Sequence, residues 1–140
     1  MSNTPAPQPN RLRVWQQNIN KSQVAQEDLI NSDVSKHIDL LLLQEPYIDS
    51  YSNTKATRDW RVIYPSNHLS SDKPACSVVL VSTSLDTNRW SQISILNTND
   101  LTAIQFHSAS NTLDLYNIYN DCQHNTTLDT LDSHLTAHSG

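Results

Sequence analysis

One short apolar run constrains this chain more than any other stretch: four consecutive leucines, Leu40–Leu43, followed directly by Gln-Glu-Pro at 44–46. The run is far shorter than the roughly 20 residues that cross a bilayer. Its length and its lack of polar alternation are typical of a strand buried on both faces of a sheet. Pro46 lacks an amide hydrogen and restricts the residue before it to extended geometry, so we predict that the strand ends at Glu45. The sequence thus predicts a carboxylate at the carboxyl end of a buried strand.

Composition bounds the class of protein. The 140 residues suffice for one globular domain with a hydrophobic core. The only glycine is Gly140, which excludes a glycine-rich phosphate loop and a dinucleotide-binding fingerprint. The net charge of -5 does not favour a nucleic-acid-binding protein. However, all nine Lys and Arg residues lie between Arg11 and Arg89, so the N-terminal part can still present a local basic patch.

The cysteines and the N-terminus indicate the compartment. The two cysteines, Cys76 and Cys122, lack metal-binding spacing and are too few for a disulfide framework. The N-terminus has no basic stretch followed by an apolar one, and the chain has no membrane-spanning segment. We therefore predict an intracellular protein with reduced thiols.

The pattern along the chain predicts a disordered tail at 1–10 and a domain at 11–140. The predicted strands share apolar or alternating character; they are Leu12–Gln17, the apolar run ending at Glu45, Trp60–Tyr64, Cys76–Ser82, Gln92–Leu96, Leu101–His107 and Leu113–Tyr119. Helical spacing of apolar residues predicts helices at Gln23–Ile30, with Asn20 as N-cap, and at Thr126–Thr136. One strand–helix–strand unit followed by antiparallel strands favours a mixed sheet folded toward a sandwich, with helices outside.

Three polar residues come at the ends of predicted strands: Asn18, Glu45 and Tyr119. Because the ends of neighbouring strands converge, an amide, a carboxylate and a phenol can share one edge of the sheet. Glutamate is a hard oxygen ligand suited to Mg²⁺, and Asn and Tyr side chains can hydrogen-bond a phosphate. The combination suggests metal-assisted phosphoester hydrolysis. The ordinary alternatives are a capping Asn, a solvated Glu and a packed Tyr.

Five segments, in order, resemble a known superfamily. They are Gln17-Asn-Ile-Asn20, Leu42-Leu-Gln-Glu-Pro46, Asp59-Trp-Arg-Val-Ile-Tyr64, Cys76-Ser-Val-Val-Leu-Val-Ser82 and Asn117-Ile-Tyr-Asn120. The chain after the tail resembles the N-terminal half of the endonuclease/exonuclease/phosphatase superfamily. Within it, the nearest resemblance is to the apurinic-like endonuclease domain of non-LTR (LINE-type) retrotransposons.

The resemblance implies a fold, a reaction and a set of residues. The implied fold is the DNase I-like four-layer α/β/β/α sandwich, an α+β arrangement of two facing sheets. The implied reaction is hydrolysis of a DNA phosphodiester with Mg²⁺, or Mn²⁺ in its place, as cofactor. Asn18 would help to place the phosphate, Glu45 would bind the metal, and Tyr119 would contact the scissile phosphate. The nick would prime a reverse transcriptase in the full-length protein, which implies a nuclear location.

The chain also departs from the family pattern. Asn120-Asp121 stands where a proline commonly follows the tyrosine, and the later Asp-x-Asn and Asp-His motifs are missing. We interpret Asp86-Thr-Asn88 as a turn, Asp132-Ser-His134 as a solvated helix face, and His107 as packed or capped. The sequence is therefore expected to be an incomplete domain that is inactive alone.

Three alternatives remain open. The chain could belong to another phosphoesterase of the superfamily, such as a repair nuclease, a DNase or a phosphatase acting on lipids or sugars. It could be a non-catalytic remnant or interaction module. A plain α/β domain without a site is the third alternative, and it predicts that Asn18, Glu45 and Tyr119 lie far apart.

Overall fold

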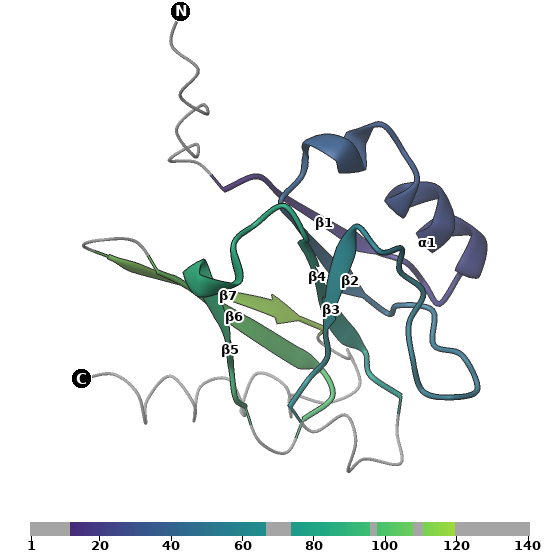
Figure 1. Cartoon of the computed structure of the whole chain (residues 1–140). Coiled ribbons are helices and arrows are strands. Elements are labelled where there is room, and N and C mark those ends of the chain that lie inside the picture. The colour runs from purple at the N-terminus through teal and green to yellow at the C-terminus, as the bar shows by residue number, and fades with distance from the viewer. Residues whose placement is uncertain (1–11, 67–73, 96–97, 108–110, 120–140) are drawn as a thin grey trace, which may run out of the picture.

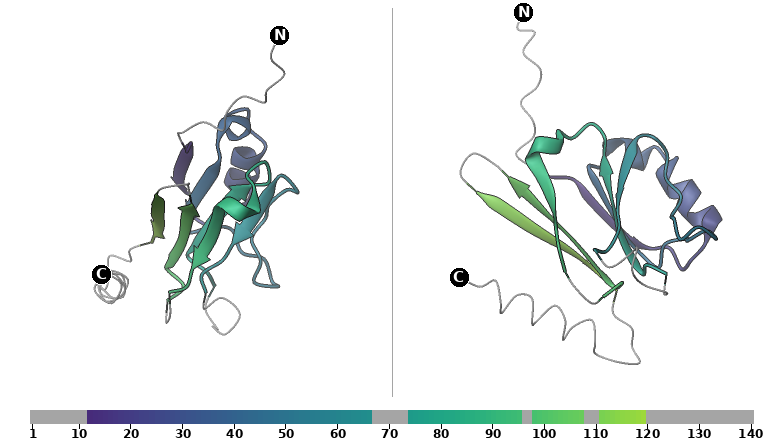
Figure 2. Two further views of the ribbon diagram at one scale, coloured as in Figure 1. Left: turned by 60° about the vertical axis from the view of Figure 1, so that its left-hand side comes forward. Right: turned by 60° about the horizontal axis from the view of Figure 1, so that its bottom comes forward.

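The computed structural model describes residues 12–66, 74–95, 98–107 and 111–119. The predicted tail at 1–10, the predicted helix Thr126–Thr136 with its Asp132-Ser-His134 segment, and Cys122 lie outside these ranges. The described strands form two sheets that face each other, with α1 on the outer side of one of them (Figures 1 and 2).

The first sheet has four strands in the order β1-β2-β4-β3. They are β1 (Val14–Asn18), β2 (Leu40–Gln44), β3 (Trp60–Ile63) and β4 (Ser77–Ser82). β1 and β2 run parallel because α1 (Gln23–Ile30) returns the chain between them, whereas β4 pairs antiparallel with β2 and with β3. Every residue of β2 is buried, which confirms the prediction made from the leucine run.

The second sheet has three antiparallel strands in the order β5-β6-β7. They are β5 (Trp90–Ile93), β6 (Leu101–His107) and β7 (Thr112–Ile118). A 3-10 helix, η3 (Thr87–Arg89), leads into β5. The strands of this sheet lie close to the predicted ranges.

The start of α1 differs from the prediction. The N-cap is Ser22, whose hydroxyl accepts a hydrogen bond from the Ala25 amide at 3.1 Å, and not Asn20. Asn20 and Lys21 both adopt positive φ angles, 55° and 61°, and so form a turn before the helix. An N-cap residue takes extended geometry, which Ser22 has and Asn20 lacks. A second 3-10 helix, η1 (Val34–His37), follows α1 and leads into β2.

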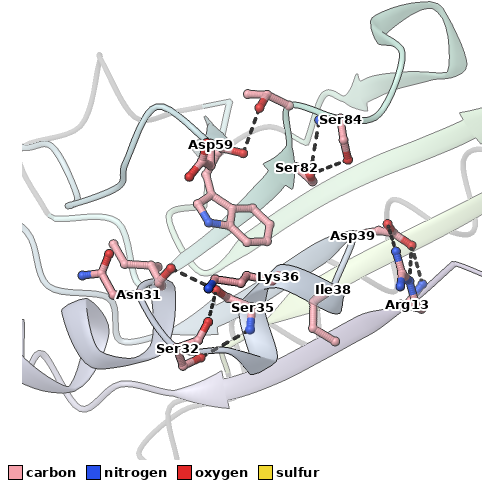
Figure 3. A pocket seen from close by; sticks show the side chains of 13 residues that line it. Arg13, Asn31, Ser32, Ser35, Lys36, Ile38, Asp39, Asp59, Ser82 and Ser84 are labelled. Atoms are coloured by element: carbon pink, nitrogen blue, oxygen red, sulfur yellow. Dashed lines mark hydrogen bonds and ion pairs between the residues drawn. The ribbon is translucent and has the colours of Figure 1, made fainter.

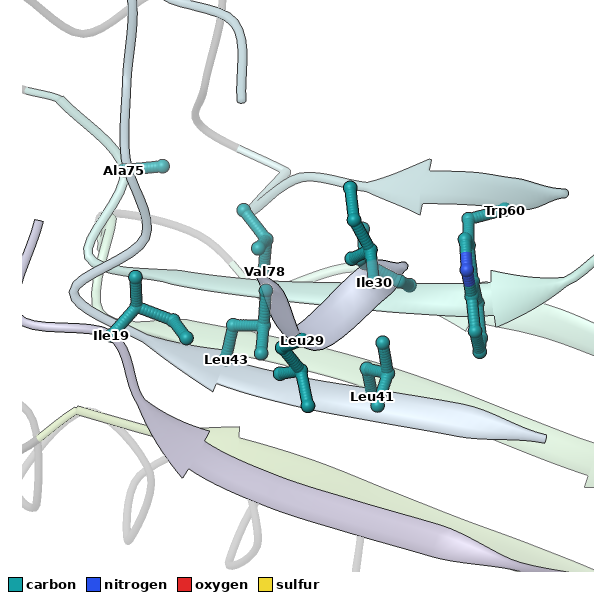
Figure 4. Packing of buried hydrophobic residues seen from close by; sticks show 9 residues of the cluster. Ile19, Leu29, Ile30, Leu41, Leu43, Trp60, Ala75 and Val78 are labelled. Atoms are coloured by element: carbon teal, nitrogen blue, oxygen red, sulfur yellow. The ribbon is translucent and has the colours of Figure 1, made fainter. Parts of the chain in front are cut away.

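Two apolar clusters hold these layers together. On the α1 side of the first sheet, Leu29 and Ile30 of the helix pack on Leu41 and Leu43 of β2 (Figure 4). Between the two sheets, the opposite faces of β2 and β4 pack on Ile104 of β6. Complete burial of one such Leu or Ile side chain contributes about 1.5–3 kcal/mol. β2 is therefore stabilised from both sides and forms a rigid base for the residue that follows it.

The layers agree with the α+β sandwich expected from the sequence, as far as the described ranges extend: helix, sheet, sheet. Within those ranges, none of the helices has the length and apolar character that crossing a bilayer requires.

Candidate active site

The carboxyl ends of β1 and β2 form the edge at which Asn18 and Glu45 lie. Asn18 is the last residue of β1 and pairs with Gln44, the last residue of β2. The amide of Ile19 then donates to the Gln44 oxygen at 2.9 Å, which keeps the two strand ends together. Asn18 is exposed and Glu45 is half-buried, so both side chains are accessible at this edge.

The backbone of Glu45 is not extended as predicted. Its φ angle is 47°, in the left-handed region that glycine favours. The Glu45 amide donates to the Cys76 oxygen at 2.9 Å, and its oxygen accepts from the Lys21 amide at 2.8 Å. These two bonds hold the turn on both sides. The prediction was wrong because it rested on the local preference of the residue before proline for extended geometry, which these long-range hydrogen bonds override.

The Asn18 side chain makes a hydrogen bond within the loop that follows β1. Its Oδ1 accepts a hydrogen bond from the Asn20 amide at 2.8 Å, which forms a tight polar turn. This turn carries the positive φ angles of Asn20 and Lys21 and directs the chain into α1. The bond engages the Oδ1 atom of Asn18, and the Nδ2 group takes no part in it.

Tyr119 reaches the same edge from the second sheet. It follows β7 directly, and its amide donates to the Asp100 oxygen at 2.9 Å. The neighbouring Asn99 oxygen accepts from the Cys76 amide at 2.9 Å, and Cys76 in turn is bonded to Glu45. This series of main-chain bonds links the segments that carry Glu45 and Tyr119 at one edge of the molecule.

A second carboxylate, Asp100, belongs to this edge, and sequence reasoning did not identify it. The pKa of the Cys76 thiol is raised to about 11, first by burial, then by the charge of Asp100 and its hydrogen bond to the thiol. Glu45 also raises this pKa, whereas the positive charge of Lys21 lowers it. The thiol therefore lies among two carboxylates and one cation. In the sequence, the only indication of Asp100 was its position just before a predicted strand.

Below the edge, a buried polar cluster links the two sheets, and it too was missed. Its centre is Asn117 of β7, which bonds to Gln44 and to the main chain of β2 and β4. The Ser77 hydroxyl donates to the Asn117 oxygen at 2.8 Å. A polar residue in a strand, two positions before Tyr119, was the signal that could have indicated it.

The other sequence candidates have ordinary roles. The Asp86 side chain accepts from the Asn88 amide at 2.9 Å and caps η3, which confirms the predicted turn. His107 Nε2 lies 3.1 Å from the Ser91 hydroxyl on the adjacent strand, in agreement with a capped role.

A hollow of about 370 Å³ lies at the opposite end of the first sheet, where β1 and β2 begin and β4 ends. Figure 3 shows Arg13 directed toward Asp39 in its wall, and the two are 3.2 Å apart. Trp60 and Ser82 also line it. The hollow therefore contains none of the predicted site residues and lies away from Glu45.

The donor set at the Glu45 edge fits a lightly coordinated Mg²⁺ ion. In the described part of the chain, no three His, Cys, Asp or Glu side chains are grouped so that they could hold a metal ion by themselves. Mg²⁺ does not need such a cage, since it commonly takes one or two carboxylates and completes its shell with waters and substrate phosphate. Glu45 offers such a carboxylate on a rigid base.

The comparison with solved structures agrees with the resemblance in sequence. The endonuclease domain of TRAS1, a telomere-specific non-LTR retrotransposon, is similar to this chain with a TM-score of 0.68 and 18% sequence identity. The match covers 91% of this chain and 53% of that one, so this chain spans about half the length of the domain it matches. No protein-family profile and no curated protein matches the sequence. The chain thus has the two-sheet, DNase I-like fold of the retrotransposon endonuclease domain that its motifs resemble.

Proposed function

We propose that this chain is part of a Mg²⁺-dependent DNA endonuclease that nicks a phosphodiester bond. The observation that carries the proposal is the common edge of Asn18, Glu45 and Tyr119, in a fold similar to a retrotransposon endonuclease domain. An amide, a carboxylate and a phenol at one accessible edge suit recognition of a phosphate group beside a metal ion.

Glu45 would hold the ion, Mg²⁺ or in its place Mn²⁺. When bound, the ion polarises a phosphoryl oxygen and lowers the pKa of a coordinated water. The hydrogen bonds of the Glu45 main chain to Cys76 and Lys21 hold the backbone turn from which the carboxylate extends. A rigid carboxylate loses little entropy when it binds a cation.

Asn18 and Tyr119 would hold the phosphodiester beside Glu45. The Asn18 Nδ2 group donates hydrogen bonds, and its orientation is set by the bond from Asn20 to Oδ1. The Tyr119 hydroxyl can donate to a phosphate oxygen. Lys21 adds an exposed cation at this edge, which would favour the negatively charged backbone of DNA.

We also infer that the 140-residue chain does not nick DNA by itself. Hydrolysis needs a general base within hydrogen-bond reach of the attacking water; Glu45 is assigned to the metal, and Asp100 is hydrogen-bonded to the Cys76 thiol. The chain spans about half of the domain it matches, 53% of its length, so the base would come from further polypeptide. In the full-length protein, the partners would be nuclear DNA and a reverse transcriptase that extends the nicked strand.

Nicking of supercoiled plasmid DNA tests the proposal, with this chain alone and with the protein in which it is continued to a whole domain. We expect Mg²⁺-dependent nicking only from the longer protein. Glu45→Gln should lower its rate by roughly a hundredfold or more. Glu27→Gln is the matched control, since it makes the same chemical change on α1, away from the edge.

Each of three other outcomes would contradict one part of the proposal. Unchanged nicking by Glu45→Gln removes Glu45 from the metal site. Nicking by the short chain overturns the inferred incompleteness. Cleavage of lipid or sugar phosphoesters without DNA cleavage shows that the substrate class is wrong and favours a phosphatase of the same superfamily.

A further inference from the structure

Asn117 is a fully buried side-chain amide in the middle of an apolar interface. It lies in β7 with 1% of its surface exposed. Burying an amide is unfavourable unless its donors and acceptor are all hydrogen-bonded. The contacts that satisfy Asn117 all come from the opposite sheet, so the position of this residue depends on how the two sheets are joined.

The Asn117 amide binds both central strands of the first sheet. Its Nδ2 group donates to the Leu43 oxygen at 2.9 Å and to the Val78 oxygen at 2.7 Å. Leu43 and Val78 are paired across the ladder between β2 and β4. Asn117 Oδ1 accepts a hydrogen bond from Nε2 of Gln44. One side chain of the second sheet therefore holds β2 and β4 at the level where both meet the candidate site.

The main chain around Asn117 is held as well. The Ser77 hydroxyl donates to the Asn117 oxygen at 2.8 Å, and the Thr102 hydroxyl donates to the Ser77 oxygen at 2.8 Å. Gln44 is itself oriented by Gln16 of β1, whose Nε2 donates to Gln44 Oε1 at 2.5 Å. The network thus includes strands of both sheets and extends to β1, which carries Asn18.

The spacing along the two strands connects this network to the site. Leu43 lies two residues before Glu45, and Asn117 lies two residues before Tyr119. The bond between Leu43 and Asn117 therefore joins the two strands at a point two residues before each site residue. We propose that Asn117 is a positioning residue that sets the placement of Glu45 relative to Tyr119. This inference rests on the proposed function.

The apolar contacts between the sheets cannot do this alone. Leu42, Val79 and Ile104 are buried there, but hydrophobic contact is non-directional and permits small sliding of one sheet over the other. Hydrogen bonds depend on distance and angle, so they hold one register. Removing the Asn117 amide should therefore loosen the edge more than an equally destabilising loss of apolar contact.

Native-state hydrogen exchange of the 140-residue chain tests this directly. In the wild-type chain, the amides of Glu45 and Tyr119 donate to Cys76 and Asp100 and should be protected. We expect these two amides and the Asn117 side-chain amide to exchange through one shared opening, with the same dependence on denaturant. Independent openings of the two amides would overturn the proposal without the need for any variant.

A matched pair of variants extends the test. Asn117→Leu removes the amide at similar volume, whereas Ile104→Ala destabilises the same interface by loss of apolar contact. We expect Asn117→Leu to lower the protection of the Glu45 and Tyr119 amides roughly tenfold more than that of Leu41 and Leu80. In Ile104→Ala all protected amides should lose protection together. Equal, uniform loss in both variants would mean that Asn117 only stabilises the fold.

The failure of this proposal can be told from failure of the proposed function. Hydrogen exchange reports the coupling of the two strand ends without metal or DNA. If the coupling is found but Glu45→Gln does not affect nicking, Asn117 aligns an edge that is not catalytic. If Glu45→Gln abolishes nicking but the amides open independently, the function stands and the role of Asn117 is wrong.

Discussion

The side-chain amide of Asn117 donates to the main-chain oxygen of Leu43, 2.9 Å away in the opposite sheet. This bond, together with those to Val78 and Gln44, joins the two sheets just below the edge that carries Glu45 and Tyr119. The candidate site is therefore formed jointly by both sheets, and its geometry depends on their register.

Loss of these bonds should also reduce global stability. We predict that Asn117→Leu lowers the free energy of unfolding by about 2–4 kcal/mol, because it leaves buried partners such as the Gln44 amide unsatisfied. Thr102→Val, which removes a single inter-sheet bond at similar volume, should cost about 1 kcal/mol. Urea unfolding followed by tryptophan fluorescence measures both. Equal losses in the two variants would contradict the central place of Asn117.

The left-handed backbone conformation of Glu45 should lower the free energy of unfolding. A non-glycine residue in this region is unfavourable by about 1–2 kcal/mol per residue, so Glu45→Gly should raise the free energy of unfolding, by about 1 kcal/mol or less. Glu45→Gln keeps the side-chain volume and the backbone penalty and serves as the control. A loss of stability in Glu45→Gly would show that the turn is not strained. A gain of stability in Glu45→Gly is the result expected if the glutamate is retained at this position for function and not for stability.

The Cys76 thiol should react slowly with alkylating reagents. Its pKa of about 11, against 9.0 for an ordinary thiol, reduces the reactive thiolate about a hundredfold near pH 8. Asp100→Asn should lower this pKa and accelerate alkylation, because the charge and the hydrogen bond of Asp100 both favour the neutral thiol. The measurement uses a Cys122→Ser background, so that one thiol is followed. An unchanged alkylation rate in Asp100→Asn would show that Asp100 does not interact with the Cys76 thiol at the Glu45 edge.

The same thiol gives a pH dependence of stability. The folded chain holds this proton up to about pH 11, whereas an unfolded thiol loses it near the ordinary pKa of 9.0. The unfolded state thus binds fewer protons between these values, and stability should fall as the pH rises from 9 toward 11. Cys76→Ser should remove this part of the decline in urea unfolding measured across the range. An identical decline in Cys76→Ser would assign it to other groups.

The corrected start of α1 predicts the effect of a capping substitution. Ser22→Ala should lower the free energy of unfolding by about 1 kcal/mol, because the Ala25 amide loses its acceptor. Ser94→Ala, at an exposed position, is the control and should change it by less than about 0.5 kcal/mol. Equal values for the two variants would contradict the assignment of Ser22 as N-cap.

Much of the fold could be predicted from local patterns. The leucine run indicated a strand buried on both faces, and β2 has that burial because α1 covers one face and the second sheet the other. The spacing of Val24, Ala25, Leu29 and Ile30 predicted the helix bounds Gln23–Ile30. Periodicity succeeds in these cases because it records which face of an element is buried.

Long-range polar contacts could not be predicted in this way. Gln44 and Asn117 are separated by 73 positions along the chain, and neither strand pattern shows that their side chains meet. The positive φ angles of Asn20, Lys21 and Glu45 were also missed, since glycine is the usual signal and the described chain uses other residues. Both misses lie at the candidate site, where contacts between distant segments override local preference.

Substoichiometric Mn²⁺ added to the ¹⁵N-labelled 140-residue chain tests the central claim most directly, because paramagnetic broadening locates the bound ion. The account predicts broadening centred on the amides of Asn18, Glu45 and Cys76, which is lost in Glu45→Gln and retained in Glu27→Gln. Broadening centred on the Asp39 hollow, or broadening at the Glu45 edge that persists in Glu45→Gln, would contradict it.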